Sequence, residues 1–500
     1  MPQDELCDPE LILAAEEFPD DIFQQYHTFS DYEDRIIRKL IAHGPILLRG
    51  GRGSGKSALL KEASLRINKS NIADKVLAIY VSLRYLPLLR STGSEYERFL
   101  CNLLINQVQQ LLNNKRFHIS FDSEPLIGSL QSELAKLSNQ LNRRIVILFD
   151  DAAHIGREIS LKDFFDIFRT LSSNSISCKA AIYPGVTEFG TRFDILNDAS
   201  VIDIARDEET PSFGAFFSEV ISKRYKHRLP ANVFKTLSQE AVAIFLGRAV
   251  TGNVRAFIYA CNDLADNIQG NVGLQDLDRI LKYLAADYYW PLLDEVKPKL
   301  GPYEPLVEPA RELAEKICEV VRDGMVNSGY GPSCLIHRDH IERLKKMFEI
   351  LEYAGFIVKK EASRALKSGG RGTRYALNLC NLLEIFAPSR LTSEMFKSWT
   401  VHDKEFAQIY KGGELETICL PPVSQNKDLS ILDKPIEILR KSKAYPYGLT
   451  DWRTQNLIES GFTSVCMLAD ATDQALLAVE DVGVVWLKRI RAVVGQAIWM

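Results

Sequence analysis

A glycine-rich octapeptide early in the chain has the residue types and the spacing of a phosphate-binding loop. It matches the pattern Gly-x4-Gly-Lys-Ser/Thr and consists of Gly50, Gly51, Arg52, Gly53, Ser54, Gly55, Lys56 and Ser57. In such loops the glycines let backbone N–H groups converge on phosphate oxygens. We therefore predict that residues 50–57 bind ATP, that Lys56 neutralises the β- and γ-phosphates, and that Ser57 ligates Mg²⁺.

Two adjacent carboxylates, Asp150 and Asp151, end an apolar run that follows Arg144. In open parallel sheets, ligands bind outside the carboxyl ends of the strands. Asp150 is therefore predicted to hold Mg²⁺ through water, together with Ser57, and Asp151 to orient or polarise the attacking water. The aspartate side chain is one methylene shorter than glutamate, so we expect ATP hydrolysis to be slow.

The elements that position these residues alternate along the first 210 residues. Apolar or β-branched runs at 44–50, 76–82, 144–151, 180–186 and 201–205 predict strands, and helical patterns begin at residue 56 and at about residue 94. Such alternation is typical of an α/β fold, a parallel sheet with helices on both faces. Strand, glycine loop and helix succeed one another around residues 50–57, as a P-loop requires.

The rest of the chain divides by its changing periodicity. Helical spacing replaces strand signals after about residue 212, and a later run of helices ends in a two-stranded hairpin. We predict the following organisation: an acidic segment at 1–21, a P-loop ATPase domain at 22–210, a helical lid at 211–298, a winged helix at 299–390, a linker at 391–430 and a small all-α domain at 431–500.

The order of these motifs resembles that of origin-recognition-type AAA+ ATPases and of the related STAND signalling NTPases. The segment from Ala181 to Thr187, the sequence Thr-Gly-Asn-Val-Arg ending at Arg255, and the following winged helix carry the resemblance together with the P-loop. It implies that Thr187 occupies the sensor-1 position and that Arg255, from the lid, reaches the γ-phosphate as sensor 2. Arg192 is a candidate arginine finger for a neighbouring subunit of a homo-oligomer, and an ordinary surface arginine is the alternative.

A basic hairpin lies within the predicted winged helix. Its six basic residues are Lys359, Lys360, Arg364, Lys367, Arg371 and Arg374, against the single acid Glu361. A mobile basic wing can lie along DNA phosphates without reading bases, although a charge run is also commonly a solvated face. In the tail, residues 476–491 resemble a helix-hairpin-helix, which binds either nucleic acid or a protein partner.

Composition limits the remaining possibilities. A net charge of −4 excludes a uniformly basic nucleic-acid coat, and residues 1–21 contain eight acidic residues but no lysine or arginine. No apolar run is long enough for a membrane span, so we expect a cytoplasmic protein without a membrane partner. The nine cysteines are scattered and contain no Cys-x-x-Cys pair.

These observations favour an ATP-dependent molecular switch that couples nucleotide state to oligomerisation and to engagement of DNA or of a partner. No nuclease or protease constellation is evident, so a separately encoded effector protein is a further expected partner. By analogy alone, this domain organisation is compatible with a role in mobile-element control or anti-phage defence in prokaryotes. The rivals are a replication-initiator-like, sequence-specific DNA-binding ATPase and a STAND-type signalling scaffold that acts on a protein.

Overall fold

The structure is a computed structural model of the 500-residue chain. It describes residues 15, 18–69, 74–84, 88, 91–153, 158–186, 189–190, 192–386, 388–399, 405–423, 429–442, 445 and 448–499. Most of the acidic segment predicted at 1–21 lies outside these residues. In the part of the chain that is described, no helix is both long enough and apolar enough to cross a membrane.

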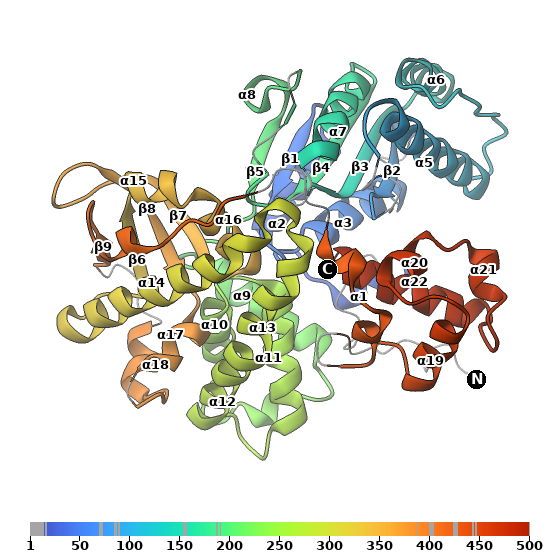
Figure 1. The fold of residues 1–500 in the computed structure, drawn as a ribbon. Coiled ribbons are helices and arrows are strands. Elements are labelled where there is room, and N and C mark those ends of the chain that lie inside the picture. Colours follow the sequence, from blue (N-terminus) through green and yellow to red (C-terminus); the bar gives the residue numbers. More distant parts are fainter. Residues whose placement is uncertain are drawn as a thin grey trace.

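A five-stranded parallel sheet forms the centre of the first domain (Figure 1). Its strands are β1 (Ile46–Arg49), β2 (Val76–Ser82), β3 (Arg144–Ala153), β4 (Ile176–Ile182) and β5 (Ser200–Asp203), in the order β2-β3-β4-β1-β5. The P-loop strand β1 therefore lies next to β4 and not next to β3, the strand that carries the paired aspartates. The α/β fold with a parallel sheet, predicted from the alternation of elements, is confirmed.

Helices cover both faces of this sheet because its central strands are apolar on both sides. Ile145, Ile147 and Phe149 of β3 pack into one core, and the intervening Val146 and Leu148 pack into another. The first core contains α5 (Gly93–Asn114), α6 (Ile127–Leu141) and α7 (Glu158–Leu171). The second contains α2 (Asp31–Ile41) and α3 (Lys56–Lys69). A strand buried on both faces reads as a continuous hydrophobic run, as this one does.

Residues 211–298 are helical in the described structure. The main elements are α9 (Pro211–Arg224), α10 (Gln239–Ala249), α11 (Val254–Asn267), α12 (Leu274–Leu284), a π-helical turn (Ala285–Tyr289) and α13 (Trp290–Val296). Asn253 begins α11 as an N-cap, since its side chain accepts a hydrogen bond from the backbone of Ala256. This cap places the start of α11 against the P-loop.

A second sheet follows the long helix α14 (Val307–Ser328). It contains β6 (Ser333–His337), β7 (Ile357–Ala365), β8 (Arg371–Leu377) and β9 (Ala407–Ile409) in the order β7-β8-β6-β9. The helices α15 (Arg338–Arg343) and α16 (Lys345–Ala354) lie between β6 and β7 in sequence, and α17 (Leu379–Glu384) follows β8. The hairpin of β7 and β8, residues 357–377, is called the wing below.

The segment predicted as a linker at 391–430 differs from that expectation. It contains α18 (Ser393–Trp399) and β9, which pairs in parallel with β6. Ile409, Leu415 and Ile418 are buried in the same core as α14 and α16. The glycine pair at 412–413 and the proline pair at 421–422 are typical of a linker, and the strand that precedes them has only three residues, too few to leave a period-2 pattern.

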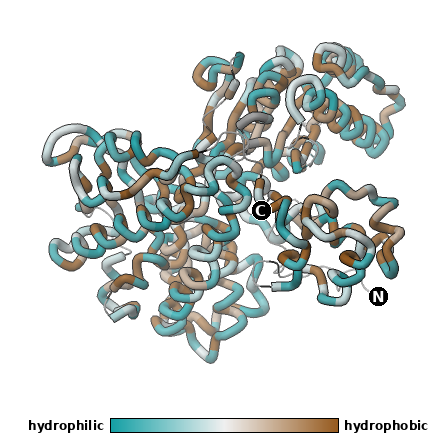
Figure 2. The backbone as a smooth tube through the Cα atoms, viewed as in Figure 1, coloured by the Kyte–Doolittle hydropathy of each residue, from teal (hydrophilic) through white to brown (hydrophobic). Residues whose placement is uncertain are grey.

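The tail forms a separate all-α unit with its own hydrophobic core. Its helices are α19 (Asp451–Glu459), α20 (Val465–Asp470), α21 (Asp473–Leu477) and α22 (Val484–Trp499). Hydrophobic and hydrophilic stretches alternate along them (Figure 2), as amphipathic helices require. A turn at residues 478–483 joins α21 to α22, at the position where the sequence resembles a helix-hairpin-helix.

Candidate nucleotide-binding site

The P-loop connects the carboxyl end of β1 to the first turn of α3. Gly53 and Gly55 have φ angles of +80° and +100°, which side-chain-bearing residues rarely adopt. The first backbone N–H groups of a helix have no partner within the helix and carry its positive dipole end. The amino end of α3, beginning at Lys56, is thus a ready site for phosphate oxygens.

The Lys56 ammonium lies inside the loop. Its Nζ donates to the carbonyl oxygens of Gly50 at 2.7 Å and Gly51 at 3.0 Å, and it lies 3.7 Å from the centroid of the Tyr183 ring. Burial lowers the pKa of Lys56 to about 7, although Asp151 and Asp150 act in the opposite direction. A phosphate group would restore the charged form of this lysine.

Both predicted carboxylates are buried at the end of β3. The Tyr80 hydroxyl donates to Oδ2 of Asp150 at 2.5 Å, and the backbone N–H of Asp151 donates to Oδ1 of Asp150 at 3.0 Å. The pairing of β3 with β4 is irregular between Phe149 and Ala153, and Asp151 has a φ of +52°. Aspartate tolerates this left-handed conformation better than most residues.

Asp151 is engaged by two residues that sequence reasoning missed. The Arg84 guanidinium lies 2.7 Å from Oδ2 of Asp151, and the Tyr183 hydroxyl donates to Oδ1 at 3.4 Å. Arg84 stands just beyond β2 and Tyr183 just beyond β4, on either side of β3. The sequence could have indicated Arg84 and Tyr183 only through their position directly after a strand. A polar residue after the carboxyl end of a parallel strand lies at the ligand-binding edge of the sheet.

The lid contacts the same loop from the other side. Backbone N–H of Arg255 donates to the Gly53 carbonyl at 3.2 Å, and the Asn253 side chain donates to the Arg52 carbonyl at 2.7 Å. A Cβ atom on Gly53 would lie 2.4 Å from Oδ1 of Asn253. Arg255 lines the cavity beside the P-loop, and its buried Nε has no hydrogen-bond partner among the described residues. Arg255 and Lys56 thus line the same cavity, and the sensor-2 role of Arg255 stays a prediction.

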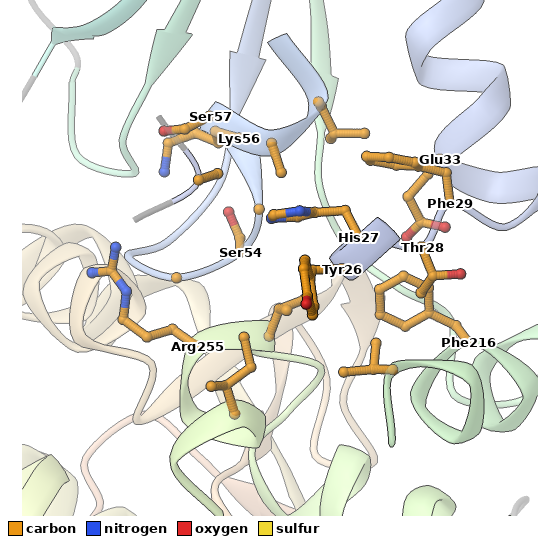
Figure 3. Close-up of a pocket in the computed structure, with 18 of the residues that line it drawn as sticks. Tyr26, His27, Thr28, Phe29, Glu33, Ser54, Lys56, Ser57, Phe216 and Arg255 are labelled. Carbon is orange, nitrogen blue, oxygen red and sulfur yellow. The ribbon is translucent and has the colours of Figure 1, made fainter. Parts of the chain in front are cut away.

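A cavity of about 930 Å³, including its open mouth, extends from the P-loop to the amino-terminal segment (Figure 3). The segment from Tyr26 to Phe29, between α1 (Phe23–Tyr26) and α2, forms one wall. Phe216 of α9 and Ile258 of α11 line the lid side. Sequence reasoning did not find this apolar end, since single aromatic residues outside any motif carry no signal of their own.

The outer side of the P-loop faces α16. Backbone N–H of Arg52 donates to the Tyr353 carbonyl at 2.9 Å, and the Arg52 guanidinium lies 3.7 Å from the Glu295 carboxylate of α13. A Cβ atom on Gly51 would lie 2.7 Å from the Glu352 carbonyl oxygen. Arg52 was predicted to bind the nucleotide, but its side chain and its amide are both directed toward other domains.

The remaining predicted site residues fall outside this constellation. Thr187, the sensor-1 candidate, lies outside the described residues. Arg192 is exposed, its carbonyl accepts a hydrogen bond from Arg169, and it does not line the cavity. The arginine-finger role would place it in a neighbouring subunit's site, and this stays a prediction.

Four of the six basic wing residues pair with nearby acids. Arg364 and Arg374 contact Glu361 at 2.8 and 2.9 Å. Lys367 lies 2.7 Å from Glu405, and Lys360 lies 3.4 Å from Glu208. The other two, Lys359 and Arg371, are exposed. The wing therefore presents less free positive charge than its sequence alone indicates.

The protein groups fit a Mg²⁺–nucleoside triphosphate. Buried Lys56 and Arg255, whose Nε is buried, both lie beside Gly53, where close packing leaves no space for a side chain. Ser57 and Asp150 could supply oxygen ligands of the kind that Mg²⁺ prefers. Among the described residues, no group of three or more His, Cys, Asp or Glu side chains could hold a metal by itself.

No protein-family model matches the chain, and no curated protein matches it. Solved structures do align with it. Cdc6p from Pyrobaculum aerophilum is 12% identical, covering 77% of this chain and 99% of that chain, with a TM-score of 0.34. ORC1 from Aeropyrum pernix, in complex with DNA, is 13% identical, covering 75% of this chain and 96% of that chain, with a TM-score of 0.32. Domain III of the Thermotoga maritima replication initiation protein DnaA is 16% identical, covering 54% of this chain and 95% of that chain, with a TM-score of 0.29.

Proposed function

We propose that this protein is an ATP-driven switch whose nucleotide state controls the packing of its domains. The observation that carries the proposal is the position of the P-loop, which contacts the lid through Asn253 and Arg255 and contacts α16 through Arg52. A ligand that binds this loop interacts with the same backbone that joins three domains. Nucleotide binding is therefore coupled to their arrangement.

Each site residue has a separate task in this function. The amino end of α3 and Lys56 bind the phosphates, Arg255 closes on them from the lid, and Ser57 and Asp150 hold the metal. When held by Ser57 and Asp150, Mg²⁺ would supply positive charge that stabilises phosphoryl transfer. Tyr80 orients the Asp150 carboxylate through the hydrogen bond to its Oδ2.

Hydrolysis is proposed to be slow because Asp151 is already engaged. Its two oxygens contact Arg84 and Tyr183, and the residue is buried. A carboxylate held by a guanidinium is a weak general base, since the positive charge stabilises its ionised form. Activation then requires Arg84 to release Asp151, which a change at the phosphate end of the site can supply.

The proposed outputs are homo-oligomerisation, with Arg192 as a finger in trans, and DNA binding through the wing and the tail. Lys359 and Arg371 are the wing cations that remain exposed without an acid partner in the described structure. Phosphate contacts of this kind position a protein on DNA without specifying sequence. The replication-initiator-like alternative adds sequence selectivity to the same contacts.

A protein-directed scaffold is a second candidate, and the surface of the tail favours it. Val484 and Val485, at the start of α22, are 62% and 80% exposed, and Trp452 is 52% exposed. Exposed apolar groups that gather on one unit are typical of protein-interaction surfaces. The ion pairs of the wing also favour a protein partner, because they neutralise positive charge that would otherwise attract DNA phosphates.

ATP hydrolysis with and without duplex DNA distinguishes these functions. The test variant is Lys359→Ala with Arg371→Ala, which leaves the wing's ion pairs in place, and the control is Lys39→Ala with Lys235→Ala, which removes two exposed charges elsewhere. Stimulation by DNA that is lost in the test variant and kept in the control supports the DNA-coupled switch. If the rate of ATP hydrolysis does not change when DNA is added, the result supports the protein-directed scaffold. If the wild-type protein does not bind ATP, both proposed functions are refuted.

A further inference from the structure

Arg206 lies in the connection between β5 and α9, where the chain passes from the sheet to the lid. Its side chain is only 7% exposed, and its Nε donates to Oε1 of Glu33, on α2, at 2.8 Å. Its Nη1 donates to the carbonyl oxygens of Ser54 at 3.1 Å and Gly252 at 3.2 Å. One guanidinium therefore contacts the helix α2, the P-loop and the turn that precedes α11.

The remaining nitrogen of this guanidinium, Nη2, has no hydrogen-bond partner among the described residues. It lies 3.5 Å from the position that a Cβ atom on Gly55 would occupy, and Arg206 lines the cavity beside the P-loop. The plane of the guanidinium is held by its other two nitrogens and by the Phe216 ring, whose centroid lies 4.7 Å away. A buried donor without an acceptor costs free energy, which an oxygen of a ligand can recover.

The position of Arg206 indicates which part of a nucleotide it would contact. Its partners Glu33 and Phe216 lie on one side of the cavity in Figure 3. Lys56 and Arg255, the groups predicted for the β- and γ-phosphates, lie on the other side. A nucleotide bound at the amino end of α3 extends from the second side to the first, so its α-phosphate is the phosphate nearest to Arg206.

We propose that Nη2 of Arg206 donates a hydrogen bond to a non-bridging oxygen of the α-phosphate of the bound nucleotide. This inference rests on the proposed nucleotide-binding function and adds a binding residue to that site. Hydrogen bonds between a guanidinium and a phosphate are charge-assisted and roughly twice as strong as neutral ones. Because Nη1 of the same side chain bonds to Ser54 and Gly252, the contact also joins the bound phosphate to the P-loop and to the lid.

Calorimetric titration of the full chain with ATP and with ADP, both with Mg²⁺, compares wild type with Arg206→Lys. Lysine keeps a positive charge beside buried Glu33, but its single nitrogen cannot occupy both the Nε and the Nη2 positions of arginine. The variant should weaken ATP and ADP equally, by about 10- to 100-fold, because both carry the α-phosphate. Arg66→Lys is the matched control and should leave both affinities unchanged, since Arg66 pairs with Asp34 and Glu62 but does not line the cavity.

The two diastereomers of ATPαS, the α-thio analogue of ATP, separate a direct contact from a structural role. They differ only in which non-bridging oxygen of the α-phosphate is replaced by sulfur, a weaker acceptor. Arg206→Lys should change the ratio of the two affinities at least about 3-fold, whereas a variant that only loosens the domains would weaken both diastereomers equally. Arg206→Gln combined with Glu33→Gln removes both buried charges, keeps the capping-box pattern of α2 and should change the ratio in the same way.

Unchanged affinities for ATP and ADP in Arg206→Lys would overturn the proposal. Loss of affinity for ATP alone would also overturn it, because Arg206 would then contact the γ-phosphate. A diastereomer ratio equal to that of wild type in both Arg206 variants would overturn it as well, since Arg206 would then act only through the fold. If wild type binds neither ATP nor ADP, the proposed function itself fails, which is distinct from a protein that binds both without Arg206.

Discussion

Nucleotide binding should be accompanied by uptake of about one proton at Lys56. The protein alone lowers the pKa of this lysine to about 7, because the side chain is buried. At pH 8 a group with that pKa is only about one-tenth protonated, whereas an ammonium held by phosphate oxygens is fully protonated. Binding at pH 8 therefore takes up ~0.9 proton, and binding at pH 6 takes up ~0.1.

The sign of the pH dependence follows from the same numbers. Below pH 7 the free protein already carries the ammonium that the phosphates require. Above pH 7, each further unit of pH reduces the affinity for the nucleotide about 10-fold, or about 1.4 kcal/mol. This decrease ends when the pH reaches the pKa of the lysine in the complex. Affinity for MgATP should thus fall between pH 7 and pH 9 although the ligand itself becomes no less anionic.

Calorimetry in buffers of different ionisation enthalpy measures the proton uptake directly. The observed enthalpy in HEPES and in Tris at pH 8 gives the number of protons exchanged, and the experiment is repeated at pH 6. Lys56→Arg is the matched control, because a guanidinium stays protonated throughout this range and should show no uptake at this position. Uptake below about 0.3 proton at pH 8 in wild type, or equal uptake in Lys56→Arg, would refute the argument that burial has shifted this lysine.

Three further substitutions test neighbouring parts of the structure. Gly51→Ala places a methyl group 2.7 Å from the Glu352 carbonyl oxygen and should lower the free energy of unfolding in urea by about 1–3 kcal/mol, whereas Gly128→Ala, with nothing within 4 Å, should not lower it. Asp150→Asn should reduce Mg²⁺-dependent hydrolysis about 100-fold while binding of ATP in EDTA is kept, and equal loss of both would contradict its role at the metal. Lys179 is fully buried, and burial lowers its pKa to about 7, so its ammonium destabilises the fold below pH 7. The free energy of unfolding should therefore increase as the pH rises above 7. Lys179→Met should remove about 1 kcal/mol per pH unit of this increase between pH 8 and 9, as measured by urea unfolding.

The parts of the fold that sequence predicted well are those with a strong local pattern. The predicted strand at 76–82 coincides with β2, and the P-loop lies between a strand and a helix as its motif requires. The run that ends at Asp150 is a central strand because both of its faces are covered. In each case one short stretch of residues contains all the information, so no knowledge of distant contacts is needed.

What the sequence did not predict depends on contacts between distant residues. Arg84 is one charged residue beyond a strand, and only the register of β2 with β3 brings it to Asp151. His27 precedes the P-loop by more than twenty residues and reaches the cavity through the turn between α1 and α2. The basic wing was identified correctly as a charged hairpin, but the acids that pair with it include Glu208 and Glu405, which lie far away in sequence.

The contacts of the P-loop constrain how such a switch can operate. Arg52 donates its amide to α16, and Gly53 lies so close to Asn253 and Arg255 that a methyl group would not fit between them. A ligand can change the arrangement of domains only through a difference in its affinity for two arrangements. Here that difference is available on the inner side of the loop, where Lys56 bonds to the carbonyls of Gly50 and Gly51. Phosphate oxygens compete with those carbonyls for the same ammonium, and one of the two carbonyls that would lose it belongs to Gly51, which packs against the Glu352 carbonyl of α16. In the proposed switch, nucleotide binding would therefore act on the α16 contact through the backbone of the loop itself.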